Sequence, residues 1–300
     1  MISLKQLYYA LAVEKTLHFK KAADACNVSQ SALSTAIIEL EKQLGTTIFE
    51  RNNKQVLITH HGQLILSKAK SVKFEVDELL QISQSNKQPF INPMTIGVIP
   101  TVGPYLLPKI LPEVRKLHPG FKLRIIEEQS QVLVDMVRRG DIDAAVLALP
   151  FPIEGLMSFT FWQEDFYWVS HKDECPSQLK EITSEELEID KLMLLKDGHC
   201  LKDHALAACS LQNEKQDSDF DSASLHTLIQ MVAGKLGTTL VPHMALDQLI
   251  HSESEIRAIH LNEPGPHRTI SLIIRPNYVR TNEITMLKDI FNTELTKKCS

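Results

Sequence analysis

Apolar side chains near the start of the chain recur at helical spacing. A first helix is indicated by Leu4, Leu7, Tyr8, Leu11 and Val13. A second, short helix follows from His18 and stops at Asn27. Ser29 is then a good N-cap for a third helix over 30–42, whose buried stripe should consist of Leu33, Ile37 and Leu40. The break before this third helix has the length of a helix-turn-helix corner, about three to four residues.

Polar residues gather near the start of the third helix, at Ser29, Gln30, Ser31, Ser34 and Thr35. In a recognition helix this end meets the base edges and phosphates of double-stranded DNA. A solvated helix face has the same composition, so these residues alone leave both interpretations open.

One long helix is predicted from Thr59 or Gly62 to about Asn86. Its apolar stripe consists of Leu64, Ile65, Val72, Val76, Leu79 and Leu80. A helix of this length must bury its stripe, either against a second copy of the chain or against the chain's own body. The polar, proline-bounded stretch 83–93 then predicts a linker.

Beyond the linker, short β-branched runs alternate with helical stretches. Strands are predicted at 94–99, 121–126, 144–149, 166–170, 238–241 and 269–274, and helices at 105–118, 131–139 and 283–297. This alternation favours an α/β body with mostly parallel strands. The turn at Thr101, between the first strand and the first helix, suits an anion or polar ligand, although an ordinary turn explains it equally well.

Composition limits the class of protein. The 300 residues suffice for about two domains. Residues 1–88 hold eleven Lys or Arg against eight Asp or Glu, and the rest hold 21 against 29, so a mildly basic head precedes an acidic body. No apolar run approaches the ~18 residues that cross a bilayer, and the N-terminus lacks the layout of a secretory signal. We therefore expect a cytoplasmic protein without membrane association.

The cysteines are few and scattered, at Cys26, Cys175, Cys200, Cys209 and Cys299. An odd number spread over a chain of this length is not the disulfide framework of a secreted domain. In a reducing cytosol, any disulfide among them is expected to be transient or regulatory.

Cys200 has the sequence context of an activated thiol. Asp197-Gly198 resembles a helix start, which places Cys200 in the first helical turn, where the helix dipole favours a thiolate. Lys202 adds positive charge, and Asp203 opposes it. We therefore expect Cys200 to be exposed and reactive, and Cys209, at the end of a Leu/Ala-rich stretch, to be buried and inert at rest.

The spacing of these two cysteines has a mechanical consequence. Nine residues along a helix correspond to ~13.5 Å of rise, and the two thiols face opposite ways. A disulfide needs α-carbons within ~7 Å, so Cys200 and Cys209 can bond only if the helix is remodelled. Such a bond would act as a switch rather than as a staple.

Three other interpretations fit the same residues. Both thiols can be ordinary core cysteines, or a zinc site can form from His199, Cys200, His204 and Cys209, although the helix spreads these ligands over two faces. A thiol peroxidase would use the same pair, but it has no need of a helix-turn-helix head. We predict no bound metal or cofactor, and a protein that is not an enzyme.

The N-terminal motifs at 28–34, 44–51 and 57–62 resemble the winged helix-turn-helix of LysR-type transcriptional regulators. The family usually has proline where this chain has Ser31, a change that costs little at a first helical position. The resemblance implies that Arg51 and Lys54 contact phosphates and that the long helix dimerises. It also implies two heads on the two half-sites of a near-palindrome.

The body resembles the two-lobed, periplasmic-binding-protein-like α/β effector domain of the same family. The resemblance implies a DNA-binding domain over 1–62, a linker and dimerisation helix over 63–92, and an effector domain over 93–300. Lobe I would hold 93–164 and 268–300, and lobe II 165–267. A ligand or sensor site is then expected in the cleft at the carboxyl ends of the strands.

Within that family, the segments 99–108, 193–209, 224–234 and 268–276 resemble the members that sense hydrogen peroxide. By that resemblance, Cys200 is the peroxidatic cysteine and Cys209 the resolving one. The residues expected to bind peroxide or favour the thiolate are Thr101, Ser130, His199 and Arg268. The chain departs from the usual pattern at Ser130, His204 and His226. We expect these changes to alter the sensitivity to peroxide or the rate at which oxidation is reversed, without abolishing the mechanism.

The resemblance implies a peroxide-responsive activator of transcription that works as a homodimer or homotetramer, with RNA polymerase as a further partner. A regulator of the same fold that senses a small organic effector between the lobes, with idle cysteines, remains the main alternative.

Overall fold

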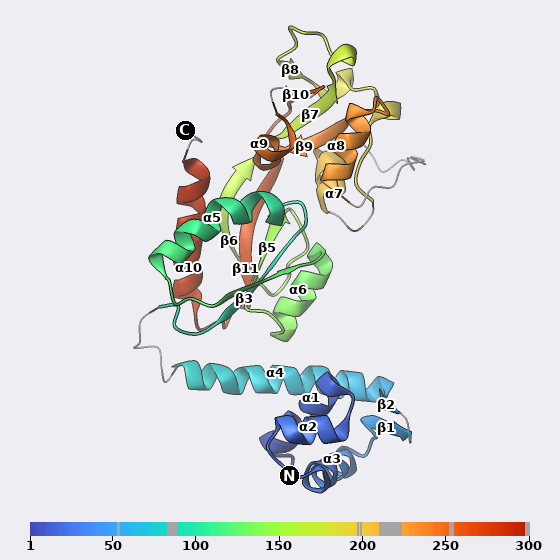
Figure 1. Cartoon of the computed structure of the whole chain (residues 1–300), viewed down its shortest axis with the longest axis vertical. Helices are drawn as coiled ribbons and strands as arrows, with labels where there is room; N and C mark the ends of the chain where they lie inside the picture. Colours follow the sequence, from blue (N-terminus) through green and yellow to red (C-terminus); the bar gives the residue numbers. More distant parts are fainter. Residues whose placement is uncertain are drawn as a thin grey trace. The chain divides into compact units, whose positions relative to one another are not determined.

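The computed structural model describes residues 1–52, 55–82, 89–196, 198, 200–209, 224–251 and 255–297. The chain forms two units, a head that extends to Lys87 and a body that begins at Gln88 (Figure 1). Within the described ranges, no helix has both the length and the apolar character needed to cross a membrane.

The head begins with three helices, α1 (Leu4–Thr16), α2 (Phe19–Ala25) and α3 (Gln30–Leu44). The Ser29 side chain accepts a hydrogen bond from the Ala32 amide and caps α3, as predicted. Asn27, between α2 and α3, has φ of 54°, a left-handed conformation that asparagine tolerates better than most residues. The α2–α3 pair is therefore a helix-turn-helix.

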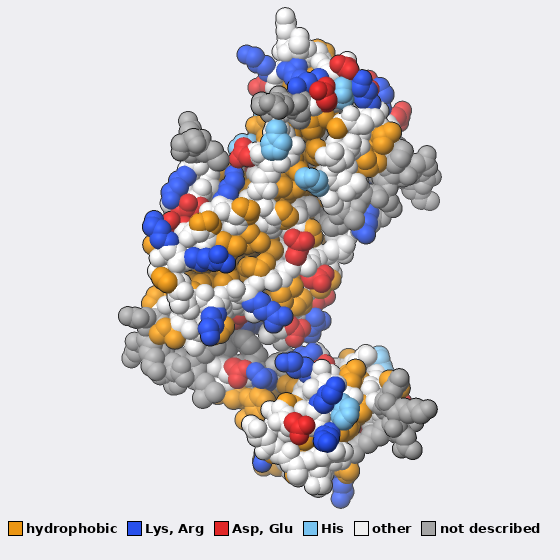
Figure 2. Space-filling model, in the orientation of Figure 1, with side chains coloured by type: hydrophobic (Ala, Val, Ile, Leu, Met, Phe, Trp, Pro, Cys, Tyr) orange, Lys and Arg blue, Asp and Glu red, His pale blue; other side chains and the backbone are white. Residues whose placement is uncertain are grey.

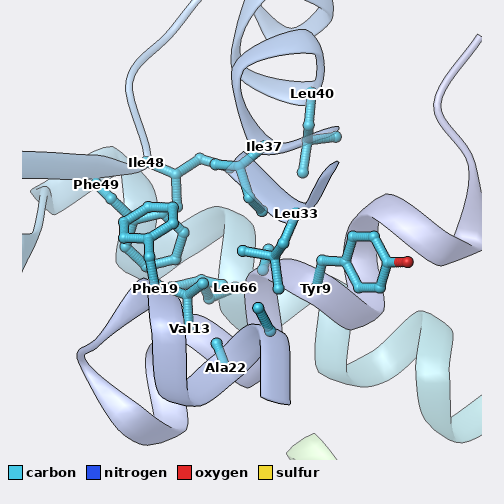
Figure 3. Close-up of a cluster of buried hydrophobic side chains, with 12 residues drawn as sticks. Tyr9, Val13, Phe19, Ala22, Leu33, Ile37, Leu40, Ile48, Phe49 and Leu66 are labelled. Atoms are coloured by element: carbon cyan, nitrogen blue, oxygen red, sulfur yellow. The ribbon is translucent and has the colours of Figure 1, made fainter. Parts of the chain in front are cut away.

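Apolar side chains of α1, α2 and α3 meet in one core (Figure 3). The predicted stripe of α3 is confirmed, because Leu33, Ile37 and Leu40 have no exposed surface. The same helix exposes the residues expected to contact DNA: Ser29, Gln30, Ser31 and Thr35 are exposed and Ser34 is half-buried.

The predicted face of α1 is confirmed in part, because Val13 is buried and Leu7 and Leu11 pack against the core. Tyr9, Ala10 and Val13 are buried, whereas Leu4 is 44% exposed. Apolar residues extend around more of this helix than the core covers, so their spacing alone does not determine which of them face inward.

Two short antiparallel strands, β1 (Phe49–Asn52) and β2 (Gln55–Ile58), follow α3 and form the wing. The long helix α4 (His60–Ile82) comes next. Leu66 and Ala69 of α4 are buried within the head. The predicted apolar stripe instead lies largely at the surface, where Leu64, Val72 and Leu79 are 59%, 40% and 65% exposed.

One part of the body, which we call lobe I, contains a five-stranded sheet. In spatial order its strands are β4 (Leu123–Glu127), β3 (Met94–Val98), β5 (Ala144–Leu149), β11 (Arg268–Ile274) and β6 (Met157–Glu164). Strands β4, β3 and β5 are parallel, and β11 runs antiparallel to both of its neighbours.

Helices cover both faces of the lobe I sheet. Gly97 faces Leu133 of α6 (Ser130–Arg139), and the next residue, Val98, faces Gly103 of α5 (Gly103–Leu117). Successive strand residues point to opposite faces, so α5 and α6 lie on opposite sides. The terminal helix α10 (Thr281–Thr296) packs on α5 and β6.

The other part of the body, lobe II, contains a four-stranded sheet. Its strands, in spatial order, are β8 (Glu181–Ile182), β10 (Ile256–Leu261), β7 (Phe166–His171) and β9 (Thr239–Pro242). Two longer helices belong to this lobe, α7 (Cys200–Ala208) and α8 (Leu225–Ala233), and α8 packs on β7 and β9. A short helix, α9 (Leu246–Leu249), follows β9.

The prediction of mostly parallel strands is wrong. In lobe II only β8 and β10 are parallel, and in lobe I the strand β11 opposes both neighbours. The chain passes from one sheet to the other between Glu164 and Phe166 and returns before Arg268. A strand that returns from another lobe is not bound to the direction that a local β-α-β unit imposes.

Charged side chains of both signs are scattered over the visible face of the body, without a broad patch of one sign (Figure 2). On this face the acidic side chains of the body are therefore spread out rather than concentrated at one place.

Candidate functional site

One edge of the lobe I sheet gathers the predicted site residues. Ser130 follows β4 and Thr101 follows β3, and the carboxyl ends of parallel strands share an edge. Because β11 runs the other way, its first residue, Arg268, lies at the same edge, opposite Glu164 of β6. We call Thr101, Ser130, Glu164 and Arg268 the polar edge.

An ion pair with no exposed surface forms the centre of the polar edge. Arg268 Nε donates to Glu164 Oε1 at 2.7 Å, and both side chains are 0% exposed. The Met244 amide donates to Glu164 Oε2 at 2.6 Å. Arg268 also donates to Thr101, from Nη1 to Oγ1 at 3.5 Å and from Nη2 to the carbonyl oxygen at 3.3 Å. The pairing allows a full charge to remain buried beside the loop that carries Thr101.

Cys200 is the first residue of α7, as predicted, but the expectation of an exposed thiol is wrong. Its side chain is buried, with 4% of the residue exposed. Burial raises the pKa of the Cys200 thiol. The Ser130 hydroxyl and the Arg268 charge act in the opposite direction without reversing the shift, and Asp203 adds to it. The thiol is therefore held protonated next to the groups that can stabilise its anion.

Ser130 is itself unusual. Its residue is 2% exposed, and its Oγ makes no hydrogen bond of standard geometry with any residue that the structure describes. The hydroxyl is nevertheless close enough to lower the pKa of Cys200. A buried hydroxyl in this state can turn its hydrogen toward an incoming oxygen or toward a thiolate.

Cys209 lies at the far end of α7 and is buried, as predicted, with 3% exposed. Its amide donates to the Ala205 carbonyl oxygen at 3.2 Å, which continues the helical bonding through this residue. Burial raises the pKa of its thiol to about 11, and Glu263 contributes to the rise. Both Cys200 and Cys209 are free thiols.

His204 lies between the two cysteines on α7 and is 2% exposed. Its Nε2 lies 2.8 Å from the carbonyl oxygen of Pro150, the residue that follows β5. Burial lowers the pKa of His204; the contact with Pro150 opposes this and the Arg268 charge adds to it. A neutral imidazole therefore joins α7 of lobe II to lobe I.

Two of the predicted contact residues, His199 and Lys54, lie outside the residues that the structure describes. Arg51 lies on β1, but its side chain is also outside the described part. The structure brings Cys200 close to Ser130 and Arg268, whereas Cys209 lies at the opposite end of the helix.

Sequence reasoning missed Glu164 and Gln129. Glu164 is 104 positions from Arg268, and no local pattern connects the two. Gly198 has φ of 93°, and a Cβ added there would lie 2.9 Å from Gln129 Oε1. This glycine, two residues before Cys200, was a signal that the backbone passes close to another segment.

The alternative of a zinc site finds no support in the described part of the chain, where no group of three or more His, Cys, Asp or Glu is arranged to hold a metal ion. Of the four candidate ligands, Cys200 and Cys209 lie at opposite ends of α7. His199 is outside the described residues.

Two family models cover most of the chain. Residues 4–63 match the bacterial regulatory helix-turn-helix protein, lysR family, and residues 88–295 match the LysR substrate binding domain. The boundary between the two matches falls close to the boundary between head and body.

Individual proteins resemble the chain over nearly its full length. The HTH-type transcriptional regulator EstR of Acinetobacter baylyi is 35% identical, over 96% of this chain and 95% of that protein. A hydrogen peroxide-inducible genes activator of Dickeya chrysanthemi is 34% identical, over 92% and 90%. Among solved structures, a full-length OxyR of Pseudomonas aeruginosa with a cysteine-to-aspartate substitution has a TM-score of 0.82 and 31% identity, over 97% and 95%.

Proposed function

Because the chain belongs to the LysR family of transcriptional regulators, we propose that it controls transcription in response to hydrogen peroxide, through oxidation of Cys200 and its bonding to Cys209. The observation that carries the proposal is the position of Cys200. This buried thiol lies beside Ser130 and Arg268, and a second buried thiol ends the same helix. The similarity to a peroxide-inducible activator supports the choice of signal.

The chemistry uses two thiols and one peroxide. The Cys200 thiolate attacks one peroxide oxygen, the O–O bond breaks, and the leaving hydroxide takes a proton to form water, so the sulfur becomes a sulfenic acid. The Cys209 thiol then attacks that sulfur, the S–O bond breaks, and a second water leaves as the disulfide forms. Thr101, Ser130 and His199 bind the peroxide, and Arg268 stabilises the thiolate.

Disulfide formation requires α7 to unwind. Helical bonding continues from Cys200 through Cys209, a separation of ~13.5 Å along the axis. The α-carbons must come within about 7 Å. The oxidised protein therefore has a different local fold, which repacks the effector domain.

The head converts this change into DNA binding. Ser29, Gln30, Ser31, Ser34 and Thr35 of α3 meet the DNA, while Arg51 and Lys54 of the wing contact phosphates. The exposed apolar stripe of α4, at Leu64, Val72 and Leu79, pairs with a second copy of the chain. Two heads then read the half-sites of a near-palindrome in the cytoplasm, as a dimer or tetramer that contacts RNA polymerase.

The test is peptide mapping by mass spectrometry after a stoichiometric pulse of hydrogen peroxide. We expect a Cys200–Cys209 disulfide in the natural chain and a trapped sulfenic acid at Cys200 in the Cys209→Ser variant. Cys175 is a matched control, because it is also buried and burial also raises its pKa. Cys175→Ser should behave like the natural chain. If Cys200 stays reduced, a small organic effector between the lobes becomes the better explanation.

A further inference from the structure

The contact between His204 and Pro150 determines which ring nitrogen carries the hydrogen. A carbonyl oxygen only accepts, so the 2.8 Å contact requires a hydrogen on Nε2. In the neutral ring Nδ1 is then an acceptor, and it is buried without a hydrogen-bonding partner among the described residues. The imidazole thus makes one hydrogen bond, through Nε2, and leaves Nδ1 without a partner among the described residues.

The position of His204 along α7 gives this contact mechanical importance. It lies four residues after Cys200, on the same helix face, and five before Cys209. Any unwinding that brings the two cysteines together changes the backbone around His204. The ring cannot keep its place against the Pro150 carbonyl while that happens.

We propose that the His204–Pro150 hydrogen bond acts as a latch, which stabilises the helical form of α7. It would thereby set how long the Cys200 sulfenic acid lasts before Cys209 attacks it. The inference rests on the proposed function, and it assigns His204 a positioning role rather than a catalytic one. The latch joins α7 in lobe II to the residue that follows β5 in lobe I, so releasing it removes one of the contacts that hold the helix to the neighbouring lobe.

Two opposing effects limit the strength of the latch. Unwinding of α7 removes the part-buried hydrogen bond between His204 and the Pro150 carbonyl, which favours the helical form. Opening also lets water reach Nδ1, whose burial without a partner favours the open helix. The net effect should therefore be modest, which suits a helix that must open once its sulfur is oxidised.

The test measures the two oxidation steps separately in the full-length protein after rapid mixing with hydrogen peroxide. Sulfenic acid formation is followed in the Cys209→Ser background, and disulfide formation in the chain with both cysteines, by alkylation and mass spectrometry. In His204→Ala we expect the first rate to stay within about twofold. We expect the second to rise about fivefold, the factor that corresponds to about 1 kcal/mol.

Two further variants isolate the hydrogen bond. His204→Gln keeps an N–H donor for the Pro150 carbonyl and should restore a disulfide rate close to that of the natural chain. His171→Ala removes another buried imidazole of lobe II, one that accepts from the Asp173 amide, and should leave both rates unchanged. A His204→Gln rate equal to that of His204→Ala would overturn the latch.

Amide hydrogen exchange of the reduced proteins provides a readout without peroxide. Residues 201–208 should exchange faster in His204→Ala than in the natural chain, and protection should return in His204→Gln. Unchanged exchange and unchanged disulfide rates in His204→Ala would refute the latch while leaving the proposed function intact. Absence of the disulfide in the natural chain itself would remove the proposed function, and the latch with it.

Discussion

The core of the head and the polar edge of the body are both buried, but they are held by different kinds of contact. In the head, side chains such as Leu33 and Ile37 pack against neighbours that are close in the sequence. At the polar edge, Arg268 pairs with Glu164 and Thr101, which lie 104 and 167 positions away. The head thus depends on local apolar packing, and the polar edge depends on charges brought together by the whole fold.

The difference has an energetic side. An apolar core tolerates substitution, because one buried side chain can be replaced by another of similar volume at a modest cost in stability. A buried charge has no such tolerance, since removing its partner leaves an ion without solvent or counter-charge. At the site that is proposed to sense peroxide, substitution of either partner of the buried ion pair is therefore expected to be costly.

The largest expected effect comes from breaking the ion pair at the polar edge. Glu164→Gln keeps the shape but leaves the Arg268 charge unpaired, and should lower the free energy of unfolding of the body by about 3–5 kcal/mol. Urea unfolding followed by tryptophan fluorescence measures this, because Trp162 and Trp168, the two tryptophans of the chain, are both in the body.

An exposed pair in the same unit is the control. Lys235 Nζ lies 2.6 Å from Asp173 Oδ2, and the two side chains are 49% and 69% exposed. Lys235→Gln should leave the unfolding curve unchanged, because solvent screens exposed pairs. Equal effects of Glu164→Gln and Lys235→Gln would show that burial adds nothing to the pair.

The second prediction concerns the head. Leu33→Ala should destabilise it by about 3 kcal/mol, through lost burial and the cavity left behind, and should weaken DNA binding. Ile38→Ala on the same helix, where the side chain is 53% exposed, should change stability by no more than about 0.5 kcal/mol. Calorimetry of both variants gives the comparison, and similar melting curves would contradict the buried role of Leu33.

These two regions also differ in how far the sequence predicts them. The third helix, its cap at Ser29 and its buried stripe follow from local rules of spacing and capping, and the structure confirms them. The core strands β3, β5 and β11 were also recognisable, because each is a short run of β-branched and apolar residues. Local signals were sufficient to recognise these elements, although the pairing of β11 with β5 joins segments that are far apart in the sequence.

Other features had no such signal. Strand β6 mixes exposed and buried positions, and it was not predicted. Cys200 is buried and its thiol interacts with Ser130 of lobe I, which no feature of α7 itself reveals. The pairing of Glu164 with Arg268 requires knowing that the chain leaves lobe I and returns. Contacts between distant segments therefore account for most of what the sequence did not predict at the site.

A smaller effect is expected at the helix cap of the head. Ser29→Ala removes the acceptor for the Ala32 amide and should cost about 1 kcal/mol of stability. Thr35→Ala is the control, since Thr35 is exposed on the same helix and caps no helix. Thermal unfolding of the two variants should separate them, and equal melting temperatures would show that the cap contributes little.

The last effect concerns His204, whose titratable ring is buried and should change the stability only as the pH falls. Its pKa is lowered from 6.5, chiefly by burial, so the folded body binds this proton less well than the unfolded chain. The stability contributed by the neutral ring is therefore complete above about pH 6.5. It is lost as the pH falls below that value toward the lowered pKa.

The glutamine side chain of His204→Gln does not titrate. The contributions of the other titratable groups to the pH dependence of stability cancel when the variant is compared with the natural chain. Going from pH 7.5 to 5.5, the natural chain should lose more stability than the variant, by at most about 1.4 kcal/mol for each pH unit below 6.5. Urea unfolding at the two pH values measures the difference. A parallel pH dependence of the two proteins would mean that the ring is protonated as easily in the folded body as in the unfolded chain, and the burial of His204 would then have no electrostatic consequence.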